Sequence, residues 1–155
     1  LIFRVIRGRT GTGKTKVLHM MRESGLQVVD LEGLANHKGS LLGRNMQSPE
    51  QPSQSYFQSK LHSELSSMDL DEVVYIEGEG KKIGNVELPA GLFTKIVESP
   101  GIELVVPLEE RVKYIMDDYK ELCNDMETLR GILSTLVSRN LQYGPKHWNQ
   151  FVCTL

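Results

Sequence analysis

Eight residues near the start of the chain, Gly8-Arg9-Thr10-Gly11-Thr12-Gly13-Lys14-Thr15, match the phosphate-binding pattern G-x-x-x-x-G-K-[ST]. Glycines in this loop let the backbone curl, so that successive N–H groups point at phosphate oxygens. The lysine supplies charge for the terminal phosphate, and the hydroxyl after it can complete a Mg²⁺ shell. The loop therefore predicts a phosphorylated ligand, Mg²⁺ as a cofactor, and seven phosphate-binding residues: Gly8, Thr10, Gly11, Thr12, Gly13, Lys14 and Thr15.

The surroundings of this loop indicate an α/β fold. Apolar strand patterns at residues 1–6, 26–30, 72–77 and 102–106 alternate with amphipathic helical patterns, the first of which directly follows the loop. Ser53 can cap one of these helices, and Pro89 lies near the start of another. Residues 78–87 read as a polar loop. We expect a three-layer, P-loop NTPase-like (kinase-like) domain with a mainly parallel sheet and a helical C-terminal tail.

The domain organisation follows from length and pattern. A chain of 155 residues suits one domain, with a core at about residues 1–122 and a helical part at about 123–155. The chain starts at Leu1, inside an apolar strand pattern, so we expect it to be a fragment of something longer. Cys123 and Cys153 form no C-x-x-C pair, which favours a reducing compartment inside the cell. No apolar run is long enough to span a membrane.

Carboxylates follow the expected strands where ligands bind in such sheets, outside the carboxyl ends. Glu77 ends the apolar run 73–76, and with Thr15 it is our predicted metal site; the alternative is that Glu77 merely terminates a strand. The catalytic candidates are the other acidic groups of these loops and one loop histidine, namely Asp30, Glu32, His37 and Glu79. His19, His62 and His147 have no predicted role. The net charge of −2 indicates no global field that recruits nucleic acid.

Three segments carry a family resemblance. They read Asp30-Leu31-Glu32-Gly33-Leu34-Ala35-Asn36-His37-Lys38-Gly39-Ser40-Leu41-Leu42-Gly43, then Gln51-Pro52-Ser53-Gln54-Ser55-Tyr56-Phe57, then Glu77-Gly78-Glu79-Gly80-Lys81-Lys82-Ile83-Gly84. In this order behind a P-loop, they resemble the C-terminal P-loop domain of the tRNA 2-selenouridine synthase family, over roughly residues 4–120. The family pattern has arginine where Lys38 stands and E-S-R-x-I-G where residues 79–84 read E-G-K-K-I-G. Replacing arginine by lysine loses bidentate phosphate binding.

The resemblance implies a particular chemistry. Such synthases carry an upstream rhodanese-like domain with a reactive cysteine, and they act on wobble 2-thiouridine of tRNA. The sulfur is first geranylated with geranyl diphosphate. The geranylthio group is then displaced, with selenophosphate as the source of selenium. The P-loop domain would bind a nucleotide or the prenyl diphosphate. Further substrate contacts are expected from six residues: Asn36, Lys38, Ser40, Gln54, Lys81 and Arg111.

Two other functions stay open. The stretch from Val105 to Val112 is similar to the kinase region that leads into a lid, which would suit a small-molecule kinase, although Arg111 has no second arginine within a turn. The other alternative is a non-catalytic, nucleotide-responsive module that holds tRNA. The sequence does not indicate an oligomeric state.

Overall fold

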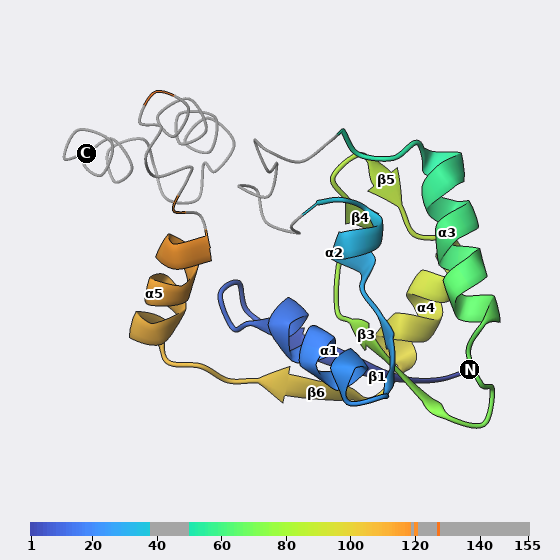
Figure 1. Ribbon diagram of the computed structural model, residues 1–155, viewed down its shortest axis with the longest axis horizontal. Helices are drawn as coiled ribbons and strands as arrows, with labels where there is room; N and C mark the ends of the chain where they lie inside the picture. Colours follow the sequence, from blue (N-terminus) through green and yellow to red (C-terminus); the bar gives the residue numbers. More distant parts are fainter. Residues whose placement is uncertain (38–49, 119, 121–126, 128–155) are drawn as a thin grey trace. The chain divides into compact units, whose positions relative to one another are not determined.

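The computed structural model describes residues 1–37, 50–118, 120 and 127 (Figure 1). The chain divides into two compact units, Leu1–Tyr114 and Ile115–Leu155. The first unit holds the sheet and the P-loop. The helical tail expected after about residue 122 lies outside the described residues, apart from one isolated position.

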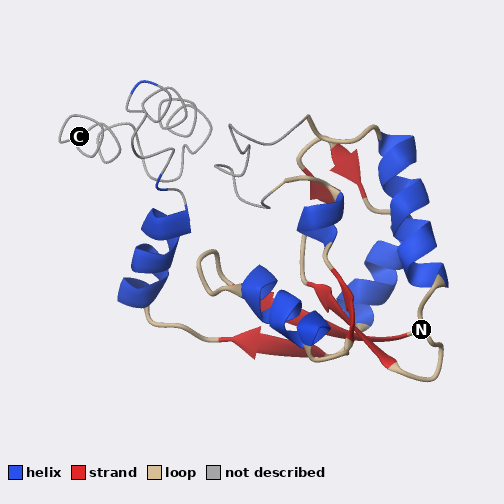
Figure 2. Cartoon of the chain, in the orientation of Figure 1, coloured by secondary structure: helices blue, strands red, loops and turns tan. Residues whose placement is uncertain are grey.

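A four-stranded parallel sheet forms the centre of the first unit (Figure 2). Its strands are β1 (Ile2–Gly8), β2 (Gln27–Val29), β3 (Val73–Glu77) and β6 (Gly101–Leu104). Their order is β2-β3-β1-β6, and all three pairings are parallel. The helices are α1 (Lys14–Glu23), α2 (Leu31–Leu34), α3 (Gln54–Ser66), α4 (Ala90–Glu98) and α5 (Leu108–Asp118).

Successive apolar side chains of the strands point to opposite faces of the sheet and form two core clusters. Val5 of β1 packs in a cluster with Phe57 of α3 and Ile96 of α4. The next residue, Ile6, packs in a separate cluster with Leu18 of α1. Because successive strand residues point to opposite faces of a sheet, α1 covers one face while α3 and α4 cover the other. This arrangement confirms the expected α/β fold with a mainly parallel sheet between helical layers.

The expected helix starts are confirmed at two positions. The Ser53 hydroxyl accepts a hydrogen bond from the Tyr56 N–H at 3.3 Å, so Ser53 caps α3. Pro89 is the residue directly before α4. Strand β6 is shorter than expected, ending at Leu104 instead of residue 106. Leu104 pairs with Gly8, where β1 leaves the sheet to enter the P-loop, so residues beyond it have no strand to pair with.

Residues 78–87, expected to be a polar loop, contain a small antiparallel hairpin. Strand β4 (Lys82–Ile83) pairs with β5 (Val86–Glu87) across a two-residue turn. The first turn residue, Gly84, has φ of 60°, which glycine adopts without strain. The expectation of a loop was wrong here because two-residue strands are too short to show a period.

Three glutamine side chains hold separate segments together through backbone groups. Gln27 bonds to both the N–H and the carbonyl of Asp69, and Gln54 bonds in the same way to Glu87. The Gln51 amide donates to the carbonyls of Ala35 and Ile83, and its oxygen accepts from the Asn85 N–H at 2.7 Å. Gln51 therefore joins the end of α2 to the hairpin.

Among the described helices, none combines the length and the apolar composition that crossing a bilayer demands.

Candidate phosphate-binding site

The P-loop is a preformed turn between β1 and α1. Gly11 and Gly13 have φ of 80° and 77°, a left-handed conformation that side chains disfavour. Thr12 closes the turn, because its hydroxyl donates to the Arg9 carbonyl at 2.8 Å. Gly13 is the N-cap of α1 and offers no side-chain acceptor. Among the described residues, no side chain caps the first N–H groups of α1, and such groups are suited to an anion.

Lys14 lies inside this loop. Its ammonium donates to the Gly8 carbonyl at 3.1 Å and lies 3.7 Å from Glu79 Oε1. Burial raises the pKa of Glu79, and the nearby Glu32 raises it further, while Lys14 lowers it. Lys14 and Glu79, predicted from separate segments, are therefore in contact. In this arrangement Glu79 pairs with the ammonium group that a phosphate would otherwise bind.

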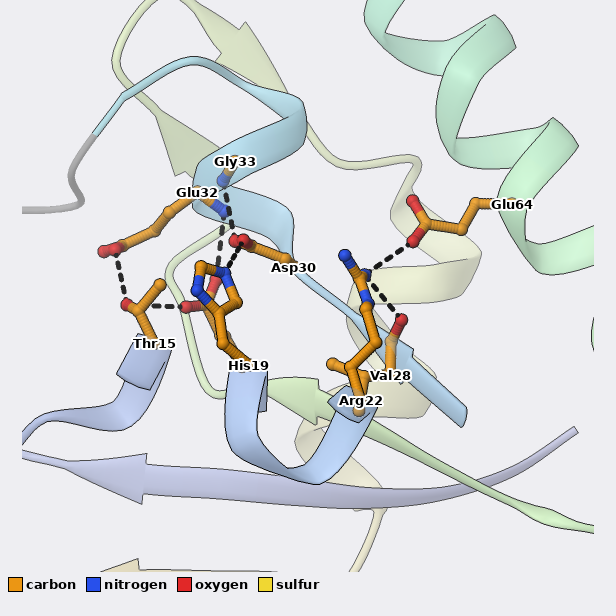
Figure 3. A network of polar contacts seen from close by, with 9 residues as sticks. Thr15, His19, Arg22, Val28, Asp30, Glu32, Gly33 and Glu64 are labelled. Atoms are coloured by element: carbon orange, nitrogen blue, oxygen red, sulfur yellow. Dashed lines mark hydrogen bonds and ion pairs between the residues drawn. The ribbon is translucent and has the colours of Figure 1, made fainter. Parts of the chain in front are cut away.

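Thr15 brings two further carboxylates together (Figure 3). Its hydroxyl lies 3.1 Å from Glu32 Oε2 and 3.1 Å from Glu77 Oε1. Glu77 is fully buried, and its other oxygen accepts the Glu32 N–H at 3.0 Å. Burial, followed by the negative charges of Glu32 and Asp30, raises the pKa of Glu77 to about 8. The expected proximity of Thr15 and Glu77 is confirmed.

The residues present fit Mg²⁺ in the way that P-loop proteins use it. Within the described residues, no three histidine, cysteine or carboxylate side chains are grouped to hold a metal by themselves. Mg²⁺ in phosphate sites, however, needs only one or two protein oxygens, since phosphates and water complete its shell. The Thr15 hydroxyl and the buried Glu77 carboxylate supply that number.

Asp30 uses both carboxylate oxygens within the fold. Oδ1 accepts the Gly33 N–H at 2.7 Å, which caps α2, and Oδ2 lies 2.7 Å from His19 Nε2. Sequence reasoning gave His19 no role. The available signal was its spacing from Thr15, because residues four apart share one face of a helix. Its partner, at the end of β2, becomes apparent only once the strand is placed.

Asn36 and His37 end α2 through their backbones. The Asn36 N–H bonds to the Gly33 carbonyl at 3.1 Å and the His37 N–H to the Glu32 carbonyl at 3.0 Å. Asn36 has φ of 46°, a left-handed value that asparagine tolerates. This pair of bonds gives Asn36 a structural task in addition to its predicted one. Lys38 and Ser40 lie outside the described residues.

The remaining predicted residues divide into two groups. Arg111 reaches the P-loop, where its Nε donates to the Thr10 carbonyl at 2.9 Å. Gln54 and Lys81 instead contact Glu87 of the hairpin, Lys81 through an exposed ion pair of 3.8 Å. In the described part of the chain, neither takes part in the contacts around Lys14 and Thr15.

This chain is similar to a family of known proteins. The family model for the tRNA 2-selenouridine synthase AAA domain matches residues 2–135. The chain belongs to that family. The tRNA 2-selenouridine synthase of Marinobacter nauticus is 42% identical over 121 residues, covering 77% of this chain and 31% of that protein. The synthase of Pseudomonas syringae pv. syringae is 36% identical over 131 residues, covering 82% and 34%.

The resemblance drawn from the three sequence segments is thereby confirmed. The chain spans about a third of the length of the curated relatives it matches. The solved structure of TT1252 from Thermus thermophilus aligns with a TM-score of 0.44 and 22% identity, covering 75% of this chain and 71% of that one. The fold of this family member is defined by its parallel sheet, with strand order β2-β3-β1-β6, and by the P-loop after β1.

Proposed function

We propose that this chain is the phosphate-binding domain of a tRNA 2-selenouridine synthase-like transferase. The domain binds geranyl diphosphate, or a nucleotide, at Gly8–Thr15. The enzyme geranylates wobble 2-thiouridine of tRNA and then exchanges the geranylthio group for selenium. Family membership supports the tRNA substrate, and the site supports the phosphorylated ligand.

One observation carries the ligand class. Lys14, Thr15 and the N-terminus of α1 converge at the end of β1, while Glu77 faces the same hydroxyl from β3. A diphosphate leaving group develops negative charge as its bond to carbon breaks. Preorganised N–H donors and a lysine stabilise that charge without having to reorganise. Mg²⁺ held by Thr15 and Glu77 would supply further positive charge to the phosphates.

The loop from Asp30 to Ser40 is proposed to contact the group attached to the phosphates, or the tRNA nucleotide. It leaves the sheet at the end of β2. In the strand order β2-β3-β1, only β3 separates β2 from the strand that leads into the P-loop. The upstream rhodanese-like domain, with its reactive cysteine, would supply the sulfur and selenium chemistry. We place the enzyme inside the cell, in a reducing compartment.

The test is a binding series by calorimetry, with geranyl diphosphate, ATP, GTP and inorganic pyrophosphate, each with and without Mg²⁺. Lys14→Ala should abolish binding while the protein stays folded. Lys16→Ala is the matched control, because Lys16 is an exposed lysine two residues further along α1. Unchanged affinity in a folded Lys14→Ala protein would refute the site. The order of affinities then identifies the ligand.

The position of Arg111 supports a second candidate, a small-molecule kinase. Its contact with the Thr10 carbonyl places a cation at the P-loop, as a phosphoryl-transfer enzyme requires. Turnover of ATP with a hydroxylated acceptor would favour the kinase over the geranyl transferase. Tight tRNA binding without turnover of any phosphorylated ligand would favour the non-catalytic module.

A further inference from the structure

The pair formed by His19 and Asp30 has the features of a proton-transfer site. Asp30 is buried, and its side chain is 11% exposed, while the side chain of His19 is 52% exposed. The carboxylate accepts from Gly33 through Oδ1 and from His19 through Oδ2. An ionised carboxylate only accepts hydrogen bonds, so the hydrogen in the second contact belongs to His19 Nε2. In the neutral tautomer that makes this contact, the lone pair of the imidazole lies on Nδ1.

The imidazole is placed beside the phosphate site. Thr15 and His19 are four residues apart on α1, so both side chains leave the same face of the helix (Figure 3). The backbone positions of Thr15 and His19 are about 6 Å apart along the helix axis, because the rise is about 1.5 Å per residue. A group attached to a phosphate held at Lys14 and Thr15 lies within reach of a side chain at that distance.

We propose that His19 is a catalytic residue of this site, a general base whose ring is oriented by Asp30. The inference rests on the proposed function and adds the group that removes the proton. As the sulfur of 2-thiouridine attacks the prenyl carbon, an S–C bond forms and the C–O bond to diphosphate breaks. The bonding electrons leave with the diphosphate oxygen. The proton on N3 of the base passes to His19 Nδ1, which balances the charge.

This role also accounts for Asp30, which sequence reasoning named as a catalytic candidate. Both of its oxygens are already engaged, so direct proton abstraction by Asp30 would break the cap of α2 or the bond to His19. A carboxylate in this position instead fixes the tautomer and orientation of the imidazole. Asp30 is therefore a positioning residue that acts through His19.

His19→Gln separates catalysis from structure. The glutamine side chain can still donate a hydrogen bond to Asp30, but it cannot accept and release a proton at neutral pH. We expect the rate of geranyl transfer from geranyl diphosphate to 2-thiouridine tRNA to fall roughly 100-fold. The rate is measured in the full-length protein. Pyrophosphate affinity and the denaturation midpoint should stay close to those of the unaltered protein. His62→Gln, an exposed histidine on α3, is the matched control.

Chemical rescue provides the second readout. Because the ring is half-exposed, added imidazole should restore part of the transfer rate of His19→Ala and should leave the His62→Gln rate unchanged. Full transfer by His19→Gln would overturn the role of His19 and leave the proposed function standing. The same holds if His19→Gln loses pyrophosphate affinity in proportion to its rate, or if imidazole restores nothing. Absence of transfer by the unaltered protein would overturn the proposed function, and the role of His19 with it.

Discussion

The Thr15 hydroxyl lies 3.1 Å from Glu77 Oε1, although the two residues come from different segments of the sequence. The same hydroxyl lies 3.1 Å from Glu32 Oε2. A hydroxyl has a single hydrogen, so it can donate to only one of these carboxylates. The raised pKa of Glu77, about 8 because of burial and the neighbouring carboxylates, resolves the conflict. Glu77 carries its own proton at neutral pH, and Thr15 is left to donate to Glu32.

The first prediction concerns stability and pH in the absence of metal. Between pH 4.5 and about pH 8, the folded protein holds a proton on Glu77 that the unfolded chain has released. Unfolding therefore releases a proton in this window, and the free energy of unfolding should fall as the pH rises through it. Glu77→Gln removes this proton, so its stability should depend less steeply on pH. Urea denaturation of both proteins across the window checks this.

Some slope should remain in the Glu77→Gln protein, since burial also raises the pKa of Glu79 and of Glu64. Equal slopes in the two proteins would show that Glu77 titrates in the folded state as it does in the unfolded chain.

The second prediction concerns the metal at the same residue. Glu77→Gln keeps the shape of the side chain but cannot lose a proton to become the carboxylate that Mg²⁺ prefers. We expect Mg²⁺-dependent ligand affinity to drop, while metal-free binding stays unchanged or improves. Glu72→Gln, an exposed carboxylate just before β3, is the control. The role of Glu77 is excluded if calorimetry finds the same Mg²⁺ dependence in both variants and the unaltered protein.

The third prediction follows from the ion pair between Lys14 and Glu79, whose atoms lie 3.7 Å apart. Glu79→Gln frees the lysine and removes a negative charge that repels phosphate. Metal-free pyrophosphate affinity should rise roughly fivefold, or about 1 kcal/mol. Weaker binding in this variant would mean that Glu79 holds Lys14 in its productive position. If the gain comes from the loss of repulsion between Glu79 and phosphate, it should vanish at high salt, because salt screens that repulsion.

The fourth prediction compares two glycines with nearly equal backbone strain. Gly13 in the P-loop has φ of 77°, and Gly25, which follows the C-cap of α1, has φ of 84°. An alanine at either position should cost about 1–2 kcal/mol of stability, because left-handed residues resist a Cβ atom. Only Gly13→Ala should also lose pyrophosphate binding. Gly25 has open space around it, so loss of binding in Gly25→Ala would point to a general loss of structure.

The fifth prediction concerns the loop after β2. His37→Ala should spare pyrophosphate binding and lower modification of 2-thiouridine tRNA, if the loop contacts the substrate beyond its phosphates. Lys38→Arg, which restores the family pattern, should at least preserve modification. Both are measured in the intact protein by following the modified nucleoside. Full modification by His37→Ala would reduce this loop to a connection between elements.

The sequence predicts the site where local pattern and sheet topology agree. An apolar run, a glycine loop and a helical pattern around Gly8–Thr15 leave little freedom for the backbone. The meeting of Thr15 with Glu77 was predictable for a different reason: parallel strands place their carboxyl ends at one edge of the sheet. Neither inference needs the positions of individual side chains.

What the sequence could not predict depends on which segments become neighbours. The His19–Asp30 pair requires the position of β2 relative to α1, and a histidine on a helix carries no local sign of its partner. The contact between Arg111 and Thr10 joins residues at opposite ends of the described chain. The hairpin at 82–87 is too short to have a period, and its position is fixed by Gln51 from another segment.

The glutamine contacts have a consequence for the chemical ageing of this protein. Gln27 and Gln54 each behave as a substitute peptide group, donating to one carbonyl and accepting from one N–H. Hydrolysis of either amide to glutamate would place a negative oxygen against a carbonyl oxygen. The change adds almost no volume, yet it turns an attractive contact into a repulsive one. For this fold, slow deamidation is therefore more damaging than its small size suggests, and it would first loosen the hairpin and the turn before β3.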